Sequence, residues 1–302
     1  MLHAVAMRRL RILTWATRPE YLQCLAQTPH EFLVVGLSDH DAVSSNVQGI
    51  APEDARRHKF DVILFQRPQH YLDEQYELLN PAQRRAAKIY LEHEPPREHP
   101  VDSRHVVSET DVVVVHIARY NRLMWDHGRV PTRVIEPGVP APAARYSGEL
   151  ERGLAVIEHV TRRRSLGLDL YEEAKKRASL DLAFGLDPAV AARYRYFFYP
   201  ARYASPTLSL IRAMMIGLPA LAFLTGGTAG VVRHGIDGYA ETDTERLIER
   251  MHELVGDRQR ASLMGEAARE HALERFSATR FVGDWNRLFG ELTPAAGERR
   301  AA

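Results

Sequence analysis

The stretch that decides the fold is residues 196–247, YFFYPARYASPTLSLIRAMMIGLPALAFLTGGTAGVVRHGIDGYAETDTERL. It contains an aromatic run that ends at residue 200, an apolar segment of helical length over 206–216, and a second compact apolar run over 219–225. Short runs that are nearly continuous in apolar residues are typical of strands covered on both faces, and a longer apolar run is typical of a buried helix. The order strand, helix, strand predicts a parallel sheet with helices on its faces.

The same alternation extends through the first half of the chain. Compact apolar runs predict strands, and segments of helical length such as residues 75–87 lie between them. The predicted strands are residues 10–15, 31–37, 60–66, 88–94 and 111–116. This repetition predicts an α/β fold with a doubly wound parallel sheet.

A segment rich in proline and glycine divides the chain. Residues 133–149 begin with a short strand and then carry Pro137, Gly138, Pro140 and Pro142, which is typical of a linker between domains. Strands and helices resume after it. Strands are predicted at 153–160 and 194–200, and further helices at 168–177, 243–256, 258–274 and 276–292.

We therefore expect two Rossmann-like domains with a cleft between them. The first domain spans residues 1–140 and the second spans residues 141–275. Residues 276–302 form a helix that packs back on the first domain, followed by a frayed tail, because the helix carries an apolar stripe at helical spacing. Ligands of such sheets bind at the carboxyl ends of the strands, so the loops that follow strands are the expected site.

Composition excludes several functional classes. The chain has 302 residues and a formal net charge of +1, which gives no broad positive field for nucleic acid. Its single cysteine, Cys24, excludes an internal disulfide and a cysteine-rich metal site, and fits a reducing cytosol. The N-terminal residues lack an apolar stretch long enough for a signal or spanning helix. We expect a cytoplasmic protein whose membrane contact, if it has any, is peripheral.

Residues 196–247 resemble the donor-binding segment of GT-B glycosyltransferases, and in particular the retaining family 4 group. The features that carry the resemblance are the AMMIGLP helix end, the strand after it, the Gly226-Gly227 loop and VVRHGIDGY. VIEPGVP before the linker and RFVGDWNRLF near the end match the same organisation, so the resemblance spans most of the chain, weakly before residue 60. It implies an enzyme that moves a sugar from a nucleotide-sugar donor to a hydroxyl acceptor, with retention and without a metal or other cofactor, in the assembly of envelope polysaccharide or another glycan.

The resemblance places the donor diphosphate beside the glycine loop. Backbone N–H groups of a glycine-rich loop at a helix start neutralise such an anion, since glycine allows close approach and the helix dipole favours negative charge. The candidates are Gly226, Gly227 and Thr228. A plain turn between a strand and a helix is the alternative.

Arginine would supply the remaining positive charge. In HVTRRRSLGLDL the expected phosphate clamp is Arg163 or Arg164, because a guanidinium group binds phosphate oxygens through two parallel hydrogen bonds. The alternative is a set of solvated arginines before a helix. Ser205 and Arg212 complete the candidate donor-binding residues.

A histidine after a predicted strand is the catalytic candidate. His93 follows the run KIYLE, and by position it matches the family's functional histidine, which contacts the donor sugar or the acceptor and helps the phosphate leave. Glu94, Arg97 and His116 are candidates for the acceptor side of the cleft, and His105 is a weaker one. Side chains at metal-ligand spacing are absent from this region.

Two positions depart from the family pattern. Family members carry two glutamates around the start of the 206–216 helix, and the second usually accepts hydrogen bonds from the ribose hydroxyls. By register these positions are Ala204 and Arg212. A guanidinium group has no acceptor lone pair and so does not replace a carboxylate there. Arg212 in an apolar helix must also find an anion, such as Glu241, or reach solvent, because burying an unpaired cation costs several kcal/mol.

Three functions remain open from the sequence. The leading one is a glycosyltransferase that acts on a nucleotide sugar and an unknown hydroxyl acceptor. The second is a catalytically degenerate GT-B protein that serves as a partner or regulatory subunit of an active glycosyltransferase, as the lost glutamates suggest. The third is an epimerase, whose acid and base would have to come from Glu92, Glu94 or Glu136.

Overall fold

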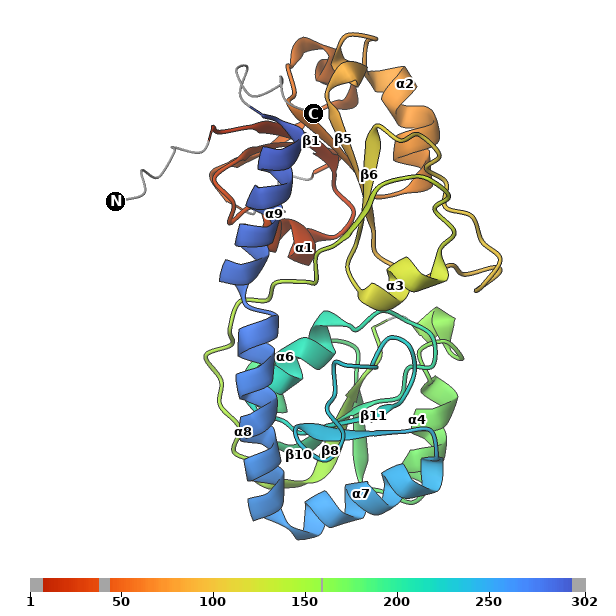
Figure 1. Ribbon diagram of the computed structural model, residues 1–302. Coiled ribbons are helices and arrows are strands. Elements are labelled where there is room, and N and C mark those ends of the chain that lie inside the picture. The colour runs from red at the N-terminus through yellow and green to blue at the C-terminus, as the bar shows by residue number, and fades with distance from the viewer. Residues whose placement is uncertain (1–7, 38–43, 159, 295–302) are drawn as a thin grey trace. The chain divides into compact units, whose positions relative to one another are not determined.

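The computed structural model describes residues 8–37, 44–158 and 160–294. The chain forms two compact units (Figure 1). Unit 1 comprises Met1–Gly138 together with Ala278–Ala302, and unit 2 comprises Val139–Ser277. The division lies close to the boundaries expected at residues 140 and 275. The expected frayed tail lies largely outside the described residues, which end at 294.

Unit 1 is built on a seven-stranded sheet in the order β3-β2-β1-β4-β5-β6-β7. All neighbouring strands in it are parallel. The strands are β1 Arg11–Trp15, β2 Glu31–Val35, β3 Val47–Ile50, β4 Val62–Phe65, β5 Ala87–Glu92, β6 Val112–His116 and β7 Thr132–Val134. The five strands predicted from apolar runs are all present. β3 was not predicted.

Both faces of this sheet are covered. Alternate residues of a strand point to opposite faces, so Ile12 and Leu64 lie in one hydrophobic cluster while Leu13 and Ile63 lie in the other. Helices α1 (Pro19–Leu25) and α9 (Ala278–Leu292) cover the first face, where α9 lies along α1 (Figure 1). The apolar stripe of α9 belongs to this core, with Phe281, Trp285, Leu288 and Phe289 all buried.

The other face is covered by an irregular segment rather than by the single helix expected over residues 75–87. One turn of π-helix at His70–Glu74 runs into α2 (Gln75–Leu78), and Leu79 then adopts an extended conformation. The helix ends there because Pro81 follows within two residues and has no N–H to continue the hydrogen-bond ladder. The other helical elements in the described part of unit 1 are 3₁₀ turns at Pro52–Arg57 and Gln83–Arg85 and the short α3 (Arg119–Met124).

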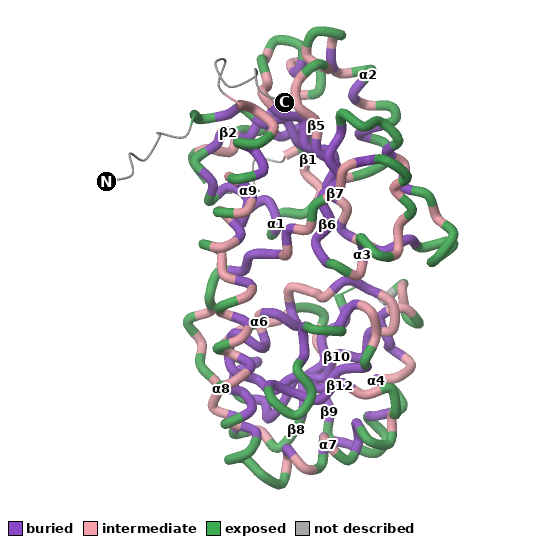
Figure 2. The backbone as a smooth tube through the Cα atoms, in the orientation of Figure 1, coloured by how far each residue is buried: buried purple, intermediate pink, exposed green. Residues whose placement is uncertain are grey.

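Unit 2 is built on a five-stranded parallel sheet in the order β12-β11-β10-β8-β9. Its strands are β8 Leu150–Val156, β9 Leu180–Ala183, β10 Tyr194–Tyr199, β11 Ala220–Phe223 and β12 Gly238–Glu241. Its helices are α4 Leu168–Lys175, α5 Pro188–Ala191, α6 Leu208–Ile216, α7 Thr244–Gly256 and α8 Arg258–Arg275, with a 3₁₀ turn at Val160–Arg162. Every residue of β10 and β11 is buried, and the tube at β10 in the middle of unit 2 has the colour of buried residues (Figure 2).

Helix α6 is fixed at both ends by local chemistry. The Thr207 hydroxyl accepts a hydrogen bond from the backbone N–H of Leu210 at 3.2 Å and so caps the first turn. Gly217 ends the helix with a φ of 106°, a left-handed conformation that favours glycine. A Cβ on Gly265 would lie 1.9 Å from the Gly217 carbonyl oxygen, so α8 passes very close to this helix end.

Each sheet has one point where the chain reverses its direction of winding. In unit 1 the chain adds β2 and β3 on one side of β1 and then places β4 on the other side. In unit 2 it adds β9 on one side of β8 and then places β10 on the other. In open parallel sheets, ligands bind outside the carboxyl ends of the strands at such switch points. The loops after β1, β4, β8 and β10 are therefore where this fold places a ligand site.

Candidate functional site

The loops after β8 and β10 are tied together at the switch point of unit 2. The Ser165 carbonyl oxygen accepts hydrogen bonds from the backbone N–H groups of Arg202 and Tyr203, at 2.9 and 3.1 Å. The Arg202 side chain binds the Asp169 carboxylate at 2.6 Å and the Arg164 carbonyl oxygen at 3.0 Å. The hydrogen bond from Arg202 holds the pKa of Asp169 below its usual range. These contacts give the arginine-containing segment a defined backbone path.

A glycine makes this close approach possible. Gly167 stands immediately before α4 with a φ of 76°, and a Cβ there would lie 2.0 Å from the Pro200 carbonyl oxygen. Only glycine combines this left-handed conformation with the absence of a side chain. The sequence analysis did not single out Gly167 or Arg202, whose importance depends on contacts between segments distant in the chain.

The expected phosphate clamp lies on this segment in exposed positions. Arg163 forms an ion pair with Glu172 at 3.2 Å, and Arg164 forms one with Asp169 at 3.3 Å. Exposed ion pairs of this kind contribute about 0–1 kcal/mol. A ligand phosphate group could therefore replace the carboxylate partners at little energetic cost. The assignment of Arg163 and Arg164 to phosphate binding stays a prediction.

The glycine loop after β11 differs from the expected helix start. Residues 226–231 form turns, and within the described part of unit 2 the next helix after β11 is α7. Thr228 is fully buried; its hydroxyl accepts a hydrogen bond from the Thr225 N–H at 3.0 Å and lies 2.5 Å from the Phe223 carbonyl oxygen. The expectation of a helix dipole at this loop is therefore wrong, and Thr228 closes a turn instead of presenting its hydroxyl at the surface.

Gly227 has a clear packing role in the same loop. A Cβ on Gly227 would lie 1.9 Å from the carbonyl oxygen of Ala204, so the loop after β11 rests directly on the loop after β10. Gly226 is its neighbour in the turn. The loop after β11 is thus held beside the switch point, and its backbone remains a candidate for binding an anion.

A carboxylate missed by the sequence analysis also lies at this switch point. Glu158 is exposed, follows β8, and accepts a hydrogen bond from the Ser209 hydroxyl of α6 at 2.5 Å. Ser205, a predicted donor-binding residue, is buried in the loop after β10. Its carbonyl oxygen accepts a hydrogen bond from the Tyr199 hydroxyl at 3.0 Å. The strand predicted over 153–160 placed Glu158 inside the strand, and β8 in fact ends at Val156, so no signal in the sequence marked this carboxylate.

The arginine in the apolar helix reaches the surface of α6. Arg212 is half-buried, as is Leu208 one turn earlier, while the residues between them are buried. Positions four residues apart share one helix face, so this face of α6 is partly open to solvent. Glu241, one expected anionic partner, instead lies 3.8 Å from His234. The partial exposure of Arg212 reduces the cost of placing its charge on this helix.

In unit 1, His93 lies directly after β5, as predicted from the sequence. Its ring is 6% exposed and meets the Tyr21 ring edge-on at 5.1 Å between centroids. Its Nε2 lies 3.2 Å from Oε1 of Gln66, which follows β4 at the switch point. Burial first, and then the positive charge of Arg18, hold the pKa of His93 well below its usual value. His93 is therefore neutral at physiological pH.

Glu94 is engaged by arginines on both sides. Its carboxylate lies 3.1 Å from Arg18 and 2.8 Å from Arg97. Its backbone N–H donates to the Glu92 carboxylate at 2.9 Å. The loop after β5 is thus linked to the loop after β1, and Glu94 and Arg97 lie together near His93. Their assignment to the acceptor side stays a prediction. These contacts give Glu92 and Glu94 structural partners, which weakens the epimerase interpretation.

His116 does not line a surface of unit 1, contrary to its expected place on the acceptor side. Its side chain is fully buried, and its Nε2 lies 2.7 Å from Nε2 of His127. His105 stacks on His127 with 5.6 Å between ring centroids, and its Nε2 lies 3.4 Å from the Glu92 carboxylate. Burial is the largest cause of the lowered pKa of His116 and of His127, whose pKa falls to about 4. The three histidines form one cluster, in which His105 and His116 are buried and His127 is half-buried.

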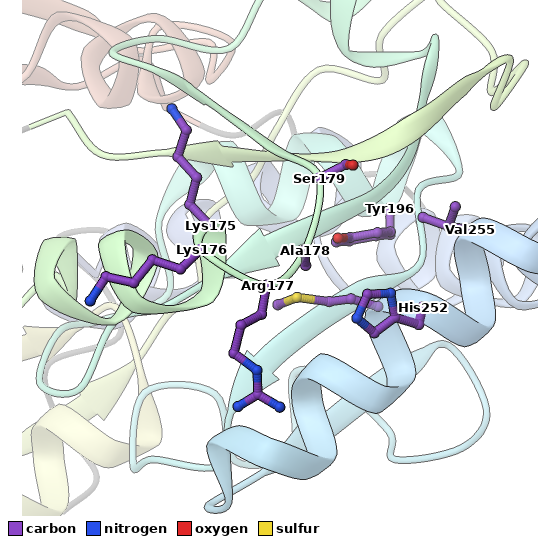
Figure 3. Close-up of a pocket in the computed structure, with 9 residues that line it drawn as sticks. Lys175, Lys176, Arg177, Ala178, Ser179, Tyr196, His252 and Val255 are labelled. Atoms are coloured by element: carbon purple, nitrogen blue, oxygen red, sulfur yellow. The ribbon is translucent and has the colours of Figure 1, made fainter.

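A separate cavity of about 300 Å³ lies at the amino ends of the unit 2 strands, between the loop after α4 and helix α7. Lys175, Lys176, Arg177 and His252 surround it, with Tyr196 beside them (Figure 3). Lys175 and Lys176 extend away from Tyr196 and His252 (Figure 3). Arg177 pairs with Glu245. The cationic groups do not converge on one point, so we assign this cavity no ligand.

Residues 8–37, 44–158 and 160–294 contain no cluster of three or more His, Cys, Asp or Glu side chains that could hold a metal ion. None of the helices in those same ranges has the length and apolar character needed to cross a bilayer.

Comparison with known proteins identifies the fold. Sucrose-phosphate synthase from Thermosynechococcus elongatus matches with a TM-score of 0.69 and 12% identity, over 94% of this chain and 99% of that chain. Anabaena HepE in complex with UDP and glucose matches with a TM-score of 0.71 and 13% identity, over 94% of this chain and 100% of that chain. AviGT4, a glycosyltransferase involved in avilamycin A biosynthesis, matches with a TM-score of 0.61 and 13% identity, over 94% of this chain and 98% of that chain. The predicted GT-B fold, with two Rossmann-like parallel sheets, is confirmed.

Sequence comparison covers a smaller region. N-acetyl-alpha-D-glucosaminyl L-malate synthase of Bacillus anthracis is 31% identical over 87 residues, which are 28% of this chain and 23% of that relative. The aligned region is thus less than a quarter of that protein's length. No family model matches the chain.

Proposed function

We propose that this chain, which has the GT-B fold, is a glycosyltransferase that moves a sugar from a nucleotide-sugar donor to a hydroxyl acceptor. The observation that carries the proposal is the arrangement at the switch point of unit 2. There Glu158, Arg163 and Arg164 from the loop after β8 and the backbone beside Gly227 from the loop after β11 lie at the carboxyl ends of the strands. A nucleoside diphosphate requires positive charge and backbone N–H donors for its phosphate groups, and a hydrogen-bond acceptor for its ribose hydroxyl groups. This edge of the sheet offers all three.

The comparisons support the same proposal. One similar structure contains UDP and glucose, and another is a sucrose-phosphate synthase. A fold by itself hosts many functions, so the proposal depends on the groups at the site. Uridine nucleotides are the first ligands to test, because UDP and UDP-glucose are named in the HepE structures.

In the proposed reaction, charge develops on the departing diphosphate. Arg163 and Arg164 stabilise it through guanidinium hydrogen bonds, and backbone N–H groups near Gly226 and Gly227 contribute further. His93 orients the reacting hydroxyl groups. We propose that the transfer proceeds with retention and without a metal ion. The setting that we propose is the cytoplasm or the membrane surface, in envelope polysaccharide or other glycan assembly.

A thermal-shift screen tests the donor. The ligands are the diphosphates of uridine, guanosine, adenosine and thymidine, and the corresponding nucleotide sugars. A ligand that binds the native state at 100 times its Kd stabilises the protein by about 2.7 kcal/mol and raises its melting temperature. The proposal expects a shift with one nucleotide class. A screen in which every nucleotide leaves the melting temperature unchanged would contradict it.

A second candidate function has one specific observation in its favour. Arg212 and Ala204 stand where related enzymes carry glutamates, which favours a GT-B protein without transferase activity that serves as the partner of an active glycosyltransferase. Turnover by the purified chain alone separates the two functions. Transfer of sugar to any hydroxyl acceptor without a second protein excludes the partner function. Nucleotide-sugar binding without turnover on any tested acceptor favours it.

A further inference from the structure

Gln66 connects the two sides of the switch point in unit 1. It follows β4, and its side-chain nitrogen lies 2.9 Å from the Thr14 hydroxyl oxygen and 3.2 Å from the Trp15 carbonyl oxygen, both on β1. Its side-chain oxygen lies 3.2 Å from Nε2 of His93, after β5. Its backbone N–H donates to Nδ1 of His70 at 3.4 Å. One half-buried amide thus joins the ends of three neighbouring strands.

The orientation of the Gln66 amide follows from its partners. A carbonyl oxygen such as that of Trp15 only accepts hydrogen bonds. The Thr14 hydroxyl donates its proton to the Leu64 carbonyl oxygen at 3.0 Å, so towards Gln66 it acts as an acceptor. The atom that faces both groups must therefore be the amide NH₂, and the atom that faces His93 must be the amide oxygen.

This orientation determines which nitrogen of His93 carries the proton. An amide oxygen has no proton to give, so the hydrogen bond to it requires an N–H at Nε2 of His93. A neutral imidazole has one N–H, and its other nitrogen is an acceptor. Charged or titratable groups beside His93 include Arg18 beyond the end of β1, which pairs with Glu94, and Tyr21 on α1. Arg18 opposes a second proton on the ring.

We propose that Gln66 is a positioning residue that holds His93 in the neutral tautomer protonated at Nε2. In that tautomer Gln66 engages the Nε2 proton, so His93 does not act as a general acid through Nε2, and Nδ1 is the ring nitrogen that accepts hydrogen bonds. The tautomer itself is a property of the free protein. Its use in sugar transfer rests on the proposed function, where an acceptor nitrogen would orient a substrate hydroxyl group.

Nitrogen NMR on protein labelled with ¹⁵N-histidine tests the tautomer directly. The His93→Gln variant assigns the resonances of His93. At pH 7 the wild type is expected to show a neutral His93 ring with the proton on Nε2. A ring protonated on Nδ1, or a doubly protonated ring, would overturn the proposal. This measurement needs neither a substrate nor a variant at Gln66.

Variants at Gln66 test the cause. Gln66→Met keeps the length of the side chain and removes its hydrogen bonds, so His93 is expected to exchange between tautomers. Gln66→Glu places a carboxylate beside Nε2, so the apparent pKa of His93 is expected to rise. Gln23→Met on the exposed face of α1 is the matched control. If Gln66→Met leaves the His93 resonances as unchanged as Gln23→Met does, Gln66 has no positioning role.

Kinetics separate this inference from the proposed function. If the protein transfers sugar, Gln66→Met lowers kcat on the order of tenfold or more at an unchanged Kd for the donor, and Gln66→Glu shifts the pH profile of kcat. Unchanged kcat in Gln66→Met would overturn the use of the tautomer in transfer. The Nε2–H tautomer in a protein that binds no nucleotide sugar would support the role of Gln66 and contradict the proposed function.

Discussion

Gly227 lies so close to Ala204 that a Cβ on Gly227 would stand 1.9 Å from the Ala204 carbonyl oxygen. This contact brings the loop after β11 against the loop after β10, at the edge where the proposed donor site lies. Gly227→Ala must therefore displace one of the two loops. The expected cost is about 1–3 kcal/mol of unfolding free energy, as for other overpacked sites, together with weaker nucleotide binding.

Urea unfolding and calorimetric titration measure these two effects. Gly185→Ala is the matched control, because a Cβ at Gly185 meets no atom within 4 Å. Equal stability and equal nucleotide affinity in the two variants would show that the packing of the two loops does not matter.

The buried histidines predict a loss of stability in mild acid. Burial lowers the pKa of His70 to about 4, and those of His93 and His116 are also lowered. The unfolded chain therefore binds protons below its ordinary histidine pKa of about 6.5 while the folded protein does not. The unfolding free energy should fall as the pH falls from about 6.5 towards 4, by about 1.4 kcal/mol per pH unit for each histidine involved.

Urea unfolding at pH 8, 6 and 5 checks this dependence. His70→Gln removes one of the buried rings, so the unfolding free energy should fall less steeply with decreasing pH. His252→Gln, at an exposed position, should leave this pH dependence unchanged. Stability that stays constant between pH 8 and pH 5 would show that these rings have the same pKa in the folded protein as in the unfolded chain.

Trp285 tests the place of α9 in unit 1. Its side chain is fully buried beside Phe289, with 5.2 Å between ring centroids. Trp285→Ala should reduce the stability of unit 1 by about 3–5 kcal/mol, as expected for removal of a large buried aromatic group. Hydrogen exchange measured separately on β1 and β10 checks this, and equal loss of protection in both sheets would contradict the assignment of α9 to unit 1.

Arg212 distinguishes an altered nucleotide site from a degraded one. Its guanidinium group lies on the partly open face of α6, the helix whose Ser209 binds Glu158. If Arg212 supplies positive charge to the site, Arg212→Glu should weaken nucleoside diphosphate binding by at least about tenfold, the loss of one hydrogen bond to a charged group. Arg246→Glu, on an exposed part of α7, is the control. Tighter binding in Arg212→Glu would instead indicate a degraded ribose pocket.

The sequence predicted the central strands because they are covered on both faces and are therefore continuous in apolar residues. β3, β9 and β12 were not predicted, and each is a four-residue strand at the edge of its sheet. Segments such as Val47–Ile50, with two exposed residues, lack the apolar continuity that marks a central strand. The short edge strands became visible only through their pairing.

The candidate site was predictable where it depended on position after a strand, and not where it depended on contacts across the fold. His93 was found because it follows a clear apolar run. The role of Gln66 depends on Thr14, which is 52 residues away in the chain. The glycine loop was read as a helix start, but the internal hydrogen bonds of Thr228 make it a turn.

The most direct measurement of the central claim is calorimetric titration of a nucleoside diphosphate, beginning with UDP, into three proteins. These are the wild type, the double variant Arg163→Ala with Arg164→Ala, and the control Arg152→Ala with Arg193→Ala. The control removes two exposed, ion-paired arginines at the amino ends of strands in the same sheet. The account predicts binding by the wild type and the control, and affinity at least about tenfold weaker in the Arg163 and Arg164 variant. Equal affinity in all three proteins would contradict the proposed phosphate clamp, and no binding by the wild type to any nucleoside diphosphate would contradict the proposed function.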